Sequence, residues 1–346
     1  MGETVQSAAG GLRARLSRFN LTGQVLALAA MVIVQTVVIG FDYASVGEWF
    51  ATWSANWVNI LRNNAIVGII SLGMTFVIIT GGIDLAVGST LVGVGTIAMV
   101  LFDTGPAGVL GGLGIEGWPA ILIGMAAAIL AGMAMGCLNG LLVTKGRIPP
   151  FIVTLGMMNI IRSVVQYFMQ ARSAPIVPDE FKALANSLIG TQRILPIIYW
   201  FALAVIMHII ARHTAFGRHV YAVGSNERTT RLSGINVDRV KILVYTLMGL
   251  MVSFAALTET ARMGSMNPSN AGSGYELDAI AAVVVGGTSM SGGRGSIVGA
   301  VLGMLIIGVM NNLLNLIGVP PFLRNACKGA IVILAVLMQR KRAQAA

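Results

Sequence analysis

The sequence predicts an all-α integral membrane protein with about ten transmembrane helices and both termini in the cytoplasm. Of its 346 residues, 56% are hydrophobic and only 10% are charged, whereas a soluble domain carries about 25% charged residues. Apolar blocks recur from end to end, and one polar, basic stretch at 211–241 divides them into two halves. We therefore expect a single transmembrane domain at 22–338, with cytoplasmic tails at 1–21 and 339–346.

The apolar blocks supply the expected helices. Residues 21–40 contain no charge and are long enough to cross the roughly 30 Å hydrocarbon layer. A signal peptide would have a shorter apolar run and a small-residue cleavage site. The nine further expected helices are a block from about Trp118 to Val143 and the blocks 60–80, 89–102, 151–170, 194–210, 242–262, 277–288, 297–316 and 322–338.

The distribution of basic residues sets the expected orientation. With the N-terminus inside, most of the 23 Lys and Arg fall in inner segments, as the positive-inside rule requires. The stretch 211–241 is then cytoplasmic, and Trp49, Trp53 and Trp57 share a helix face at the outer boundary. The net charge of +10 does not indicate nucleic acid, because the basic residues flank apolar blocks. The expected outer segments hold Arg62, Arg172, Lys182 and Arg193.

Glycine-rich segments interrupt the apolar blocks at 81–89 and 286–296. Broken helices at membrane depth are tolerated only where protein or a cavity satisfies the backbone, and binding pathways use them. The alternative is a pair of flexible turns at the cytoplasmic face. Two ridges with small residues at every fourth position predict close helix packing. They are Gly132, Gly136 and Gly140, and Gly295, Gly299 and Gly303.

Few charges lie within the apolar blocks, and such charges are candidates for function. Glu259 and Arg262 are three residues apart and can neutralise each other. The acidic residues lie at helix ends or breaks, which argues against a carrier driven by an ion gradient. Neutral amides suit a neutral hydroxylated solute, although they also bond helices together. The residues expected at a pathway or gate are Gly81, Gly82, Asp84, Asn139, Asn159, Asn311 and Asn315.

The polar stretch contains signals for a short helix at 227–233. Asn226 can cap its start and Gly234 can end it in a left-handed conformation, while Asn236 can cap the following helix. Two turns are too short to be stable alone, so this helix needs a partner to dock against. The alternative is a solvated loop, which would not need caps.

Catalytic patterns are missing from the sequence. There is no GxxxxGK[ST] phosphate loop, and the three histidines show no metal-ligand spacing. The two cysteines, Cys137 and Cys327, suit small buried apolar groups. We expect no enzyme activity, no metal and no cofactor in this chain, so a membrane-embedded enzyme is disfavoured.

Four segments together resemble the permease subunits of ribose-type ABC sugar importers. The resemblance covers about residues 55–340 in order and is specific for the family but not for the solute. The segments are 73–89 (GMTFVIITGGIDLAVGS), 149–162 (PPFIVTLGMMNIIR), 214–237 (TAFGRHVYAVGSNERTTRLSGINV) and 276–303 (ELDAIAAVVVGGTSMSGGRGSIVGAVLG).

This resemblance implies a multi-pass permease of the bacterial inner membrane that moves a monosaccharide by alternating access. The implied partners are a cytoplasmic ABC ATPase that binds ATP and Mg, a second permease copy or close relative, a periplasmic sugar-binding protein and membrane lipid. Thr229, Thr230 and Arg231 depart from the small apolar residues of many relatives. A polyol or other non-sugar solute, or an ion-driven carrier, remains the alternative. The implied coupling loop is 212–241, with ATPase contacts at Gly217, Arg218, Gly224, Asn226, Glu227, Arg231, Leu232, Gly234 and Ile235.

Overall fold

The structure is a computed structural model that describes residues 22–104, 108–170, 177–320, 323–330 and 333. These residues form α-helices and one 3-10 helix, and no strand occurs among them, which confirms the all-α class. The elements are α2 (Thr22–Ile39), α3 (Val46–Ile79), α4 (Val87–Phe102), η1 (Gly111–Leu113), α5 (Gly117–Thr144), α6 (Pro150–Phe168), α7 (Asp179–Asn186), α8 (Leu195–His213), α9 (Ala215–Ser225), α10 (Glu227–Leu232), α11 (Val237–Met263), α12 (Tyr275–Val285) and α13 (Ile297–Leu316).

Seven of the described helices are long and apolar enough to cross a membrane: α2, α3, α5, α6, α8, α11 and α13. Helix α4 has 16 residues and α12 has 11, because the glycine-rich segments shorten both. Of the expected last span, 322–338, the structure describes 323–330, which are helical, and 333; the tails 1–21 and 339–346 lie outside the described residues. The multi-pass helical fold is therefore confirmed, while the count of ten and the sides of the termini stay predictions.

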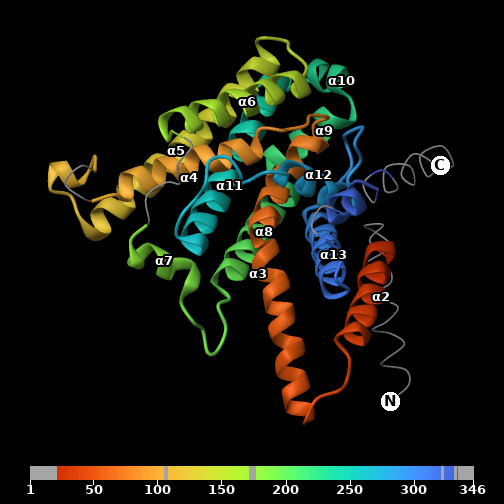
Figure 1. Cartoon of the computed structure of the whole chain (residues 1–346). Helices are drawn as coiled ribbons and strands as arrows, with labels where there is room; N and C mark the ends of the chain where they lie inside the picture. The colour runs from red at the N-terminus through yellow and green to blue at the C-terminus, as the bar shows by residue number, and fades with distance from the viewer. Residues whose placement is uncertain (1–21, 105–107, 171–176, 321–322, 331–332, 334–346) are drawn as a thin grey trace.

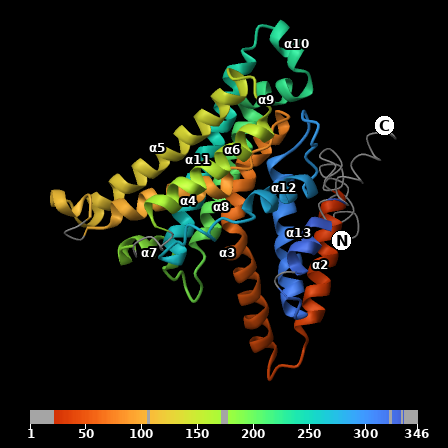
Figure 2. The same cartoon turned by 45° about the horizontal axis from the view of Figure 1, so that its top comes forward.

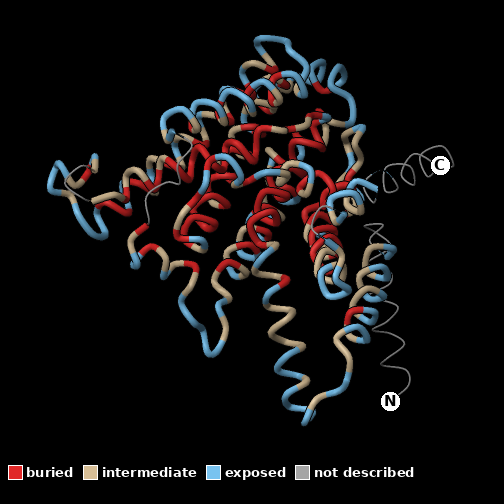
Figure 3. Tube along the Cα trace, viewed as in Figure 1, coloured by how far each residue is buried: buried red, intermediate tan, exposed pale blue. Residues whose placement is uncertain are grey.

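Helix α3 is the axis of the fold. Ser45 caps its start by accepting a 3.2 Å hydrogen bond from the Glu48 N–H, and the helix continues for 34 residues. It begins well before the apolar block at 60–80 and includes the tryptophan face, where the Trp49–Trp53 and Trp53–Trp57 ring centroids lie 6.3 and 6.0 Å apart. The first half of α3 projects from the bundle (Figure 1) and its second half is buried (Figure 3).

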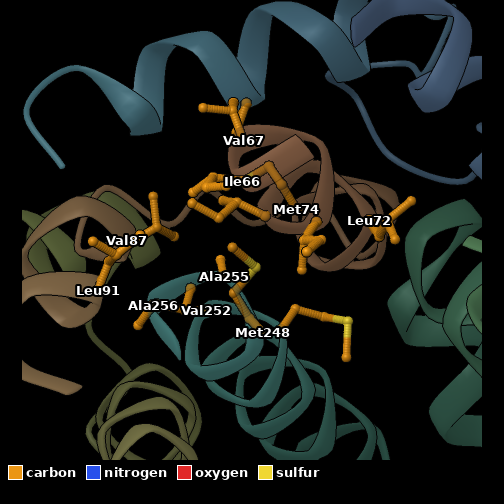
Figure 4. Close-up of a cluster of buried hydrophobic side chains, with 14 of the residues drawn as sticks. Ile66, Val67, Leu72, Met74, Val87, Leu91, Met248, Val252, Ala255 and Ala256 are labelled. Atoms are coloured by element: carbon orange, nitrogen blue, oxygen red, sulfur yellow. The ribbon is translucent and has the colours of Figure 1, made fainter. Parts of the chain in front are cut away.

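The core lies where α3, α4 and α11 meet. Figure 4 shows Ile66 and Met74 of α3 facing Leu91 of α4 and Met248 and Val252 of α11. All five side chains are almost fully buried. Flexible methionines fill the irregular gaps between these helices, so the glycine-rich segment between α3 and α4 starts from a well-packed centre.

Both predicted glycine ridges are sites of close helix contact. On α5, an added Cβ at Gly136 would overlap the Tyr245 carbonyl, and one at Gly132 would lie 2.9 Å from the Gly249 carbonyl oxygen of α11. On α13, an added Cβ at Gly303 would overlap the Ala282 carbonyl of α12. Glycine is needed at these positions because the backbones themselves are in contact.

The two ends of the bundle differ. Helices α9 and α10 lie at one end, and the end of α2 lies beside the start of α3 at the other (Figures 1 and 2). The loop between α12 and α13 reaches the end that holds α9 (Figure 1). This arrangement places both glycine-rich segments next to the polar stretch.

Candidate functional site

The short helix α10 has the predicted caps. The Asn226 side chain accepts a 2.9 Å hydrogen bond from the Thr229 N–H, which confirms the start. At the end, Gly234 has φ +82° and Ile235 N–H donates to the Thr230 carbonyl at 3.3 Å, the 6→1 bond of a Schellman motif. The helix ends at Leu232, one residue before the predicted 233, since Ser233 serves as its C-cap. The Asn236 side chain caps α11 as predicted.

Ion pairs hold α10 on the protein. Glu227 lies 2.6 Å from Lys241 Nζ and 3.4 Å from Arg231, and Arg231 lies 3.0 Å from Asp238. Lys145, at the end of α5, is 3.6 Å from Asp238. The hydrogen bond from Lys241 lowers the pKa of Glu227 below its ordinary value, and Arg231 lowers that pKa further. One side of α10 is therefore held by ion pairs to residues at the start of α11. Its other side has no such contact among the described residues.

The other side of α10 is open. Leu232 is 82% exposed, and the neighbouring residues from Ser225 to Gly234 are exposed apart from Thr230. Leu232 and its exposed polar neighbours therefore form an accessible face of this helix. The sequence pattern predicted this short helix, and the structure shows which of its residues are exposed; its docking to another protein stays a prediction.

Helix α9 is an element that the sequence did not predict. Thr214 caps it by accepting a 3.1 Å hydrogen bond from the Gly217 N–H. Gly217 sits in the corner after α8, where an added Cβ would overlap the Ile210 and Ala211 carbonyls. The Tyr221 hydroxyl donates a 3.0 Å hydrogen bond to the Gly295 carbonyl. Helix α9 therefore connects α10 to the second glycine-rich segment.

The two glycine-rich segments meet each other beneath α9. The Gly293 N–H donates a 2.9 Å hydrogen bond to the Ile79 carbonyl at the end of α3. A Cβ added at Gly224 of α9 would overlap that same carbonyl and lie 2.6 Å from the Gly293 nitrogen. We call Ile79, Gly224 and Gly293, with Gly81 and Tyr221, the junction. It joins the ends of α3 and α9 to the loop before α13.

The first segment is packed within protein. Asp84 is 4% exposed; its carboxylate accepts a 2.8 Å hydrogen bond from the Ala86 N–H and is hydrogen-bonded by the Asn139 side chain of α5. The Tyr245 and Thr154 hydroxyls each donate to the Ile83 carbonyl at 3.4 Å. This burial fits a helix break supported by protein better than a flexible turn. Helix α4 resumes at Val87, two residues before the predicted start.

The remaining pathway candidates separate into two places. Asn311 and Asn315 of α13 line a cavity of about 270 Å³ against α3, away from Asp84 and Asn139. Asn159 of α6 is exposed, and its amide bonds to the Leu155 carbonyl of its own helix at 3.1 Å. Asn159 therefore joins neither the Asn311–Asn315 pair nor the Asp84–Asn139 pair.

The sequence analysis did not identify several residues that contribute to these sites. Tyr221 and Tyr245 secure the two glycine-rich segments, and Asn63 and Asn64 line the cavity with Asn311 and Asn315. The adjacent amides at 63–64, near the start of the apolar block 60–80, were the available signal. The predicted Glu259–Arg262 pair is present at 2.9 Å. No group of three or more His, Cys, Asp or Glu in the described ranges could hold a metal.

Several apolar helices long enough to span a membrane, a buried helix break and a polar cavity between helices fit a multi-pass membrane permease. The chain belongs to the family described as branched-chain amino acid transport system / permease component, which matches residues 56–336. It is accordingly a transport subunit of the inner membrane rather than an enzyme.

The chain is also similar to individual permeases of known name. The chain is 42% identical to the ribose import permease protein RbsC of Escherichia coli (strain K12) over 290 residues, covering 83% of this chain and 86% of the relative. It is 41% identical to RbsC of Bacillus subtilis (strain 168) over 291 residues, covering 83% and 85%. Identity to the xylose transport system permease protein XylH of Escherichia coli (strain K12) is 32% over 384 residues, covering 92% of each chain. No solved structure matches the chain.

Proposed function

We propose that this chain is the transmembrane permease subunit of an ATP-driven, binding-protein-dependent importer that moves a monosaccharide by alternating access. Relatives named for ribose and for xylose, each covering more than four-fifths of this chain, favour a pentose or a similar hexose. The neutral amides of the helices fit a solute of this kind, because an amide both donates and accepts hydrogen bonds as a hydroxyl does.

The observation that carries this proposal is the continuous contact from α10 to both helix breaks. A separate ATPase, holding ATP and Mg, binds the free face of α10 around Leu232 and Arg228 at the cytoplasmic surface. Helix α9 directly precedes α10 in the chain, so a push on α10 moves Gly224 and Tyr221. Those two residues contact Ile79, Gly293 and Gly295.

The junction converts that push into a change at the breaks. Backbone contacts at Gly224 leave no room for side-chain adjustment, so movement is passed on rather than absorbed. A shift of Ile79 moves the segment that carries Asp84, and a shift of Gly293 moves the start of α13. The Gly81–Asp84 region then acts as the gate, and Asn139 moves with Asp84 through their hydrogen bond.

Two further partners complete the assembly. A second permease copy or a close relative forms the other wall of the pathway, and a periplasmic binding protein delivers the sugar at the end opposite α10. The exposed apolar faces of the outer helices, such as Phe151 and Ile160 of α6, meet that second permease or lipid.

The proposal is tested by reconstituting the chain with its ATPase and binding protein in liposomes. Uptake of labelled ribose or xylose should need ATP and the binding protein and should withstand an uncoupler. Uptake by this chain alone, abolished by the uncoupler, would instead identify an ion-driven carrier. A scrambled sequence at 217–239 should abolish ATPase stimulation by the binding protein, and unchanged stimulation would overturn the docking role.

A further inference from the structure

A polar cavity lies between the middle of α3 and the last third of α13. Its volume is about 270 Å³, just under the range of about 300–1,000 Å³ that is usual for drug-sized ligands. The cavity is about 21 Å along α13 from the residue that follows the second glycine-rich segment, at 1.5 Å per residue from Ile297 to Asn311. Its lining residues are Ile60, Asn63, Asn64, Gly308, Asn311, Asn312, Asn315 and Arg324.

The polar side chains that line this cavity keep unused hydrogen-bonding capacity. The buried Asn311 Oδ1 has no hydrogen-bond partner among the described residues, although buried polar atoms are nearly always paired. Asn64 uses its Nδ2 for a 2.7 Å bond to the Ile60 carbonyl, and its Oδ1 is left to accept. Arg324 donates from Nε to the Val319 carbonyl at 2.8 Å, and its guanidinium carries four further N–H donors.

Residues outside the cavity hold two of its other lining amides in place by hydrogen bonds. Asn312 Nδ2 donates to Asn56 at 3.0 Å, and Gln35 of α2 donates to Asn312 Oδ1 at 3.0 Å. Asn63 accepts a 2.8 Å bond from Arg262, which is itself paired with Glu259. Fixed amides lose little freedom when a ligand binds, and this preorganisation favours binding.

Glycine at 308 is part of the construction of this cavity. A Cβ there would lie 2.7 Å from Asn64 Nδ2 and 2.9 Å from its Cγ. The Asn64 amide therefore rests directly on the α13 backbone. A larger residue at 308 would push this amide into the cavity.

We propose that this cavity is a binding subsite for one small neutral solute with several hydroxyl groups, occupied during import. The inference rests on the proposed function and adds a location and a ligand chemistry to it. Paired amides match vicinal hydroxyls, because each offers both donors and an acceptor, and Arg324 donates to a hydroxyl or ring oxygen. No carboxylate lines the cavity among the residues the structure describes, so a cation is disfavoured.

A second cavity, of about 390 Å³, is a poor candidate for the same ligand. Its lining is mainly hydrocarbon, with Phe181, Leu184, Phe254 and Leu257 among the residues present. A hydroxylated solute would lose its hydrogen bonds to water there without replacement.

The first test uses solute protection of a single thiol in the full chain, held in nanodiscs. Cys137 and Cys327 are replaced by alanine, and Asn315→Cys is labelled with a small methanethiosulfonate reagent. D-ribose or D-xylose should slow labelling several-fold, whereas glycine betaine at equal osmolality should not. The control Ser187→Cys lies in the exposed loop after α7, and its labelling rate should not respond to sugar. Equal labelling of Asn315→Cys with and without sugar would overturn the subsite.

The second test measures uptake by the assembled importer. Asn311→Leu removes the unpaired acceptor at nearly constant volume and should lower sugar uptake several-fold while ATPase stimulation by the binding protein persists. Thr246→Val is the control, since its hydroxyl bonds only to the Ile242 carbonyl of its own helix, and it should transport normally. Normal uptake by Asn311→Leu would overturn the subsite and leave the proposed function standing. An assembly that moves no sugar at all would defeat the proposed function, while the protection assay would still decide the cavity.

Discussion

The Gly293 N–H donates a 2.9 Å hydrogen bond to the carbonyl oxygen of Ile79. These residues are more than two hundred positions apart: Gly293 lies within the second glycine-rich segment, and Ile79 lies two residues before the first. Gly224 of α9 covers the bond so closely that a side chain would displace it. Helix α9 therefore contacts the end of α3 and the second glycine-rich segment at a single point.

Replacement of Gly224 tests this point. Gly224→Ala places a methyl group against the Ile79 carbonyl and the Gly293 nitrogen, neither of which is a flexible side chain. We expect sugar uptake and ATPase stimulation to fall at least tenfold in the assembled importer, with membrane insertion retained. Gly156→Ala is the matched control, because no atom lies within 4 Å of a Cβ added there. Equal rates for the two variants would show that the junction does not carry the signal.

The α5–α11 contact sets part of the stability. Gly136→Ala forces a methyl group into the Tyr245 carbonyl, and overpacking of this kind typically costs about 1–3 kcal/mol. Thermal unfolding of the purified chain in detergent should show a clearly lower midpoint for Gly136→Ala. The Gly156→Ala midpoint should stay near that of the native sequence, and a similar loss in both would contradict close backbone contact.

Acidification should loosen α10. Its ion pairs depress the pKa of Glu227 from the ordinary 4.5, so the folded state gains stability above pH 4.5. That gain is lost as the pH falls through the lower pKa of the folded state. Amide exchange at Gly234 and Ile235, corrected for intrinsic rates, should therefore lose protection on acidification.

The control for this pH effect is Glu227→Gln, which removes the titrating group. Its protection at neutral pH should be lower, and the loss on acidification should be smaller. If Glu227→Gln and the native chain follow the same pH profile, the Lys241–Glu227 pair does not anchor the helix.

The ion pair between α11 residues Glu259 and Arg262 should be sensitive to single substitutions. Its side chains are only 10% and 16% exposed, and the Tyr275 hydroxyl also donates to Glu259 at 3.1 Å. Removing one partner of a buried pair typically costs about 3–5 kcal/mol, whereas replacing both with apolar residues can be nearly neutral. Glu259→Leu should therefore destabilise strongly, and Glu259→Leu/Arg262→Met should recover most of the loss. Additive effects in this double-mutant cycle would exclude the coupling.

Local signals made α10 predictable. Asn226, Gly234 and Asn236 act on backbone groups within a few residues, so their roles follow from sequence spacing alone. Helix α9 escaped prediction because its contacts are remote: Tyr221 and Gly295 are 74 positions apart. The glycines made it possible to locate both helix breaks from the sequence. The contact between the two breaks could not be predicted in this way.

The faces of helices explain the remaining differences. Asn311 and Asn159 are both amides in apolar helices, yet one lines a cavity and the other is exposed and bonded to its own turn. Either outcome satisfies the amide, and only the packing of neighbouring helices distinguishes them. The expected count of ten helices stays a prediction, since α12 has only 11 residues and is shorter than the block 277–288 predicted from its apolar composition.

The length of α3 has a mechanical consequence. Thirty-four residues at 1.5 Å each make a rod of about 51 Å, well beyond a hydrocarbon layer of about 30 Å. Its tryptophan-lined end and its junction end therefore belong to one continuous helix, with Ile79 buried near one end and Trp49 near the other. A tilt of α3 as a rigid body about its packed middle would displace Ile79 and Trp49 in opposite directions.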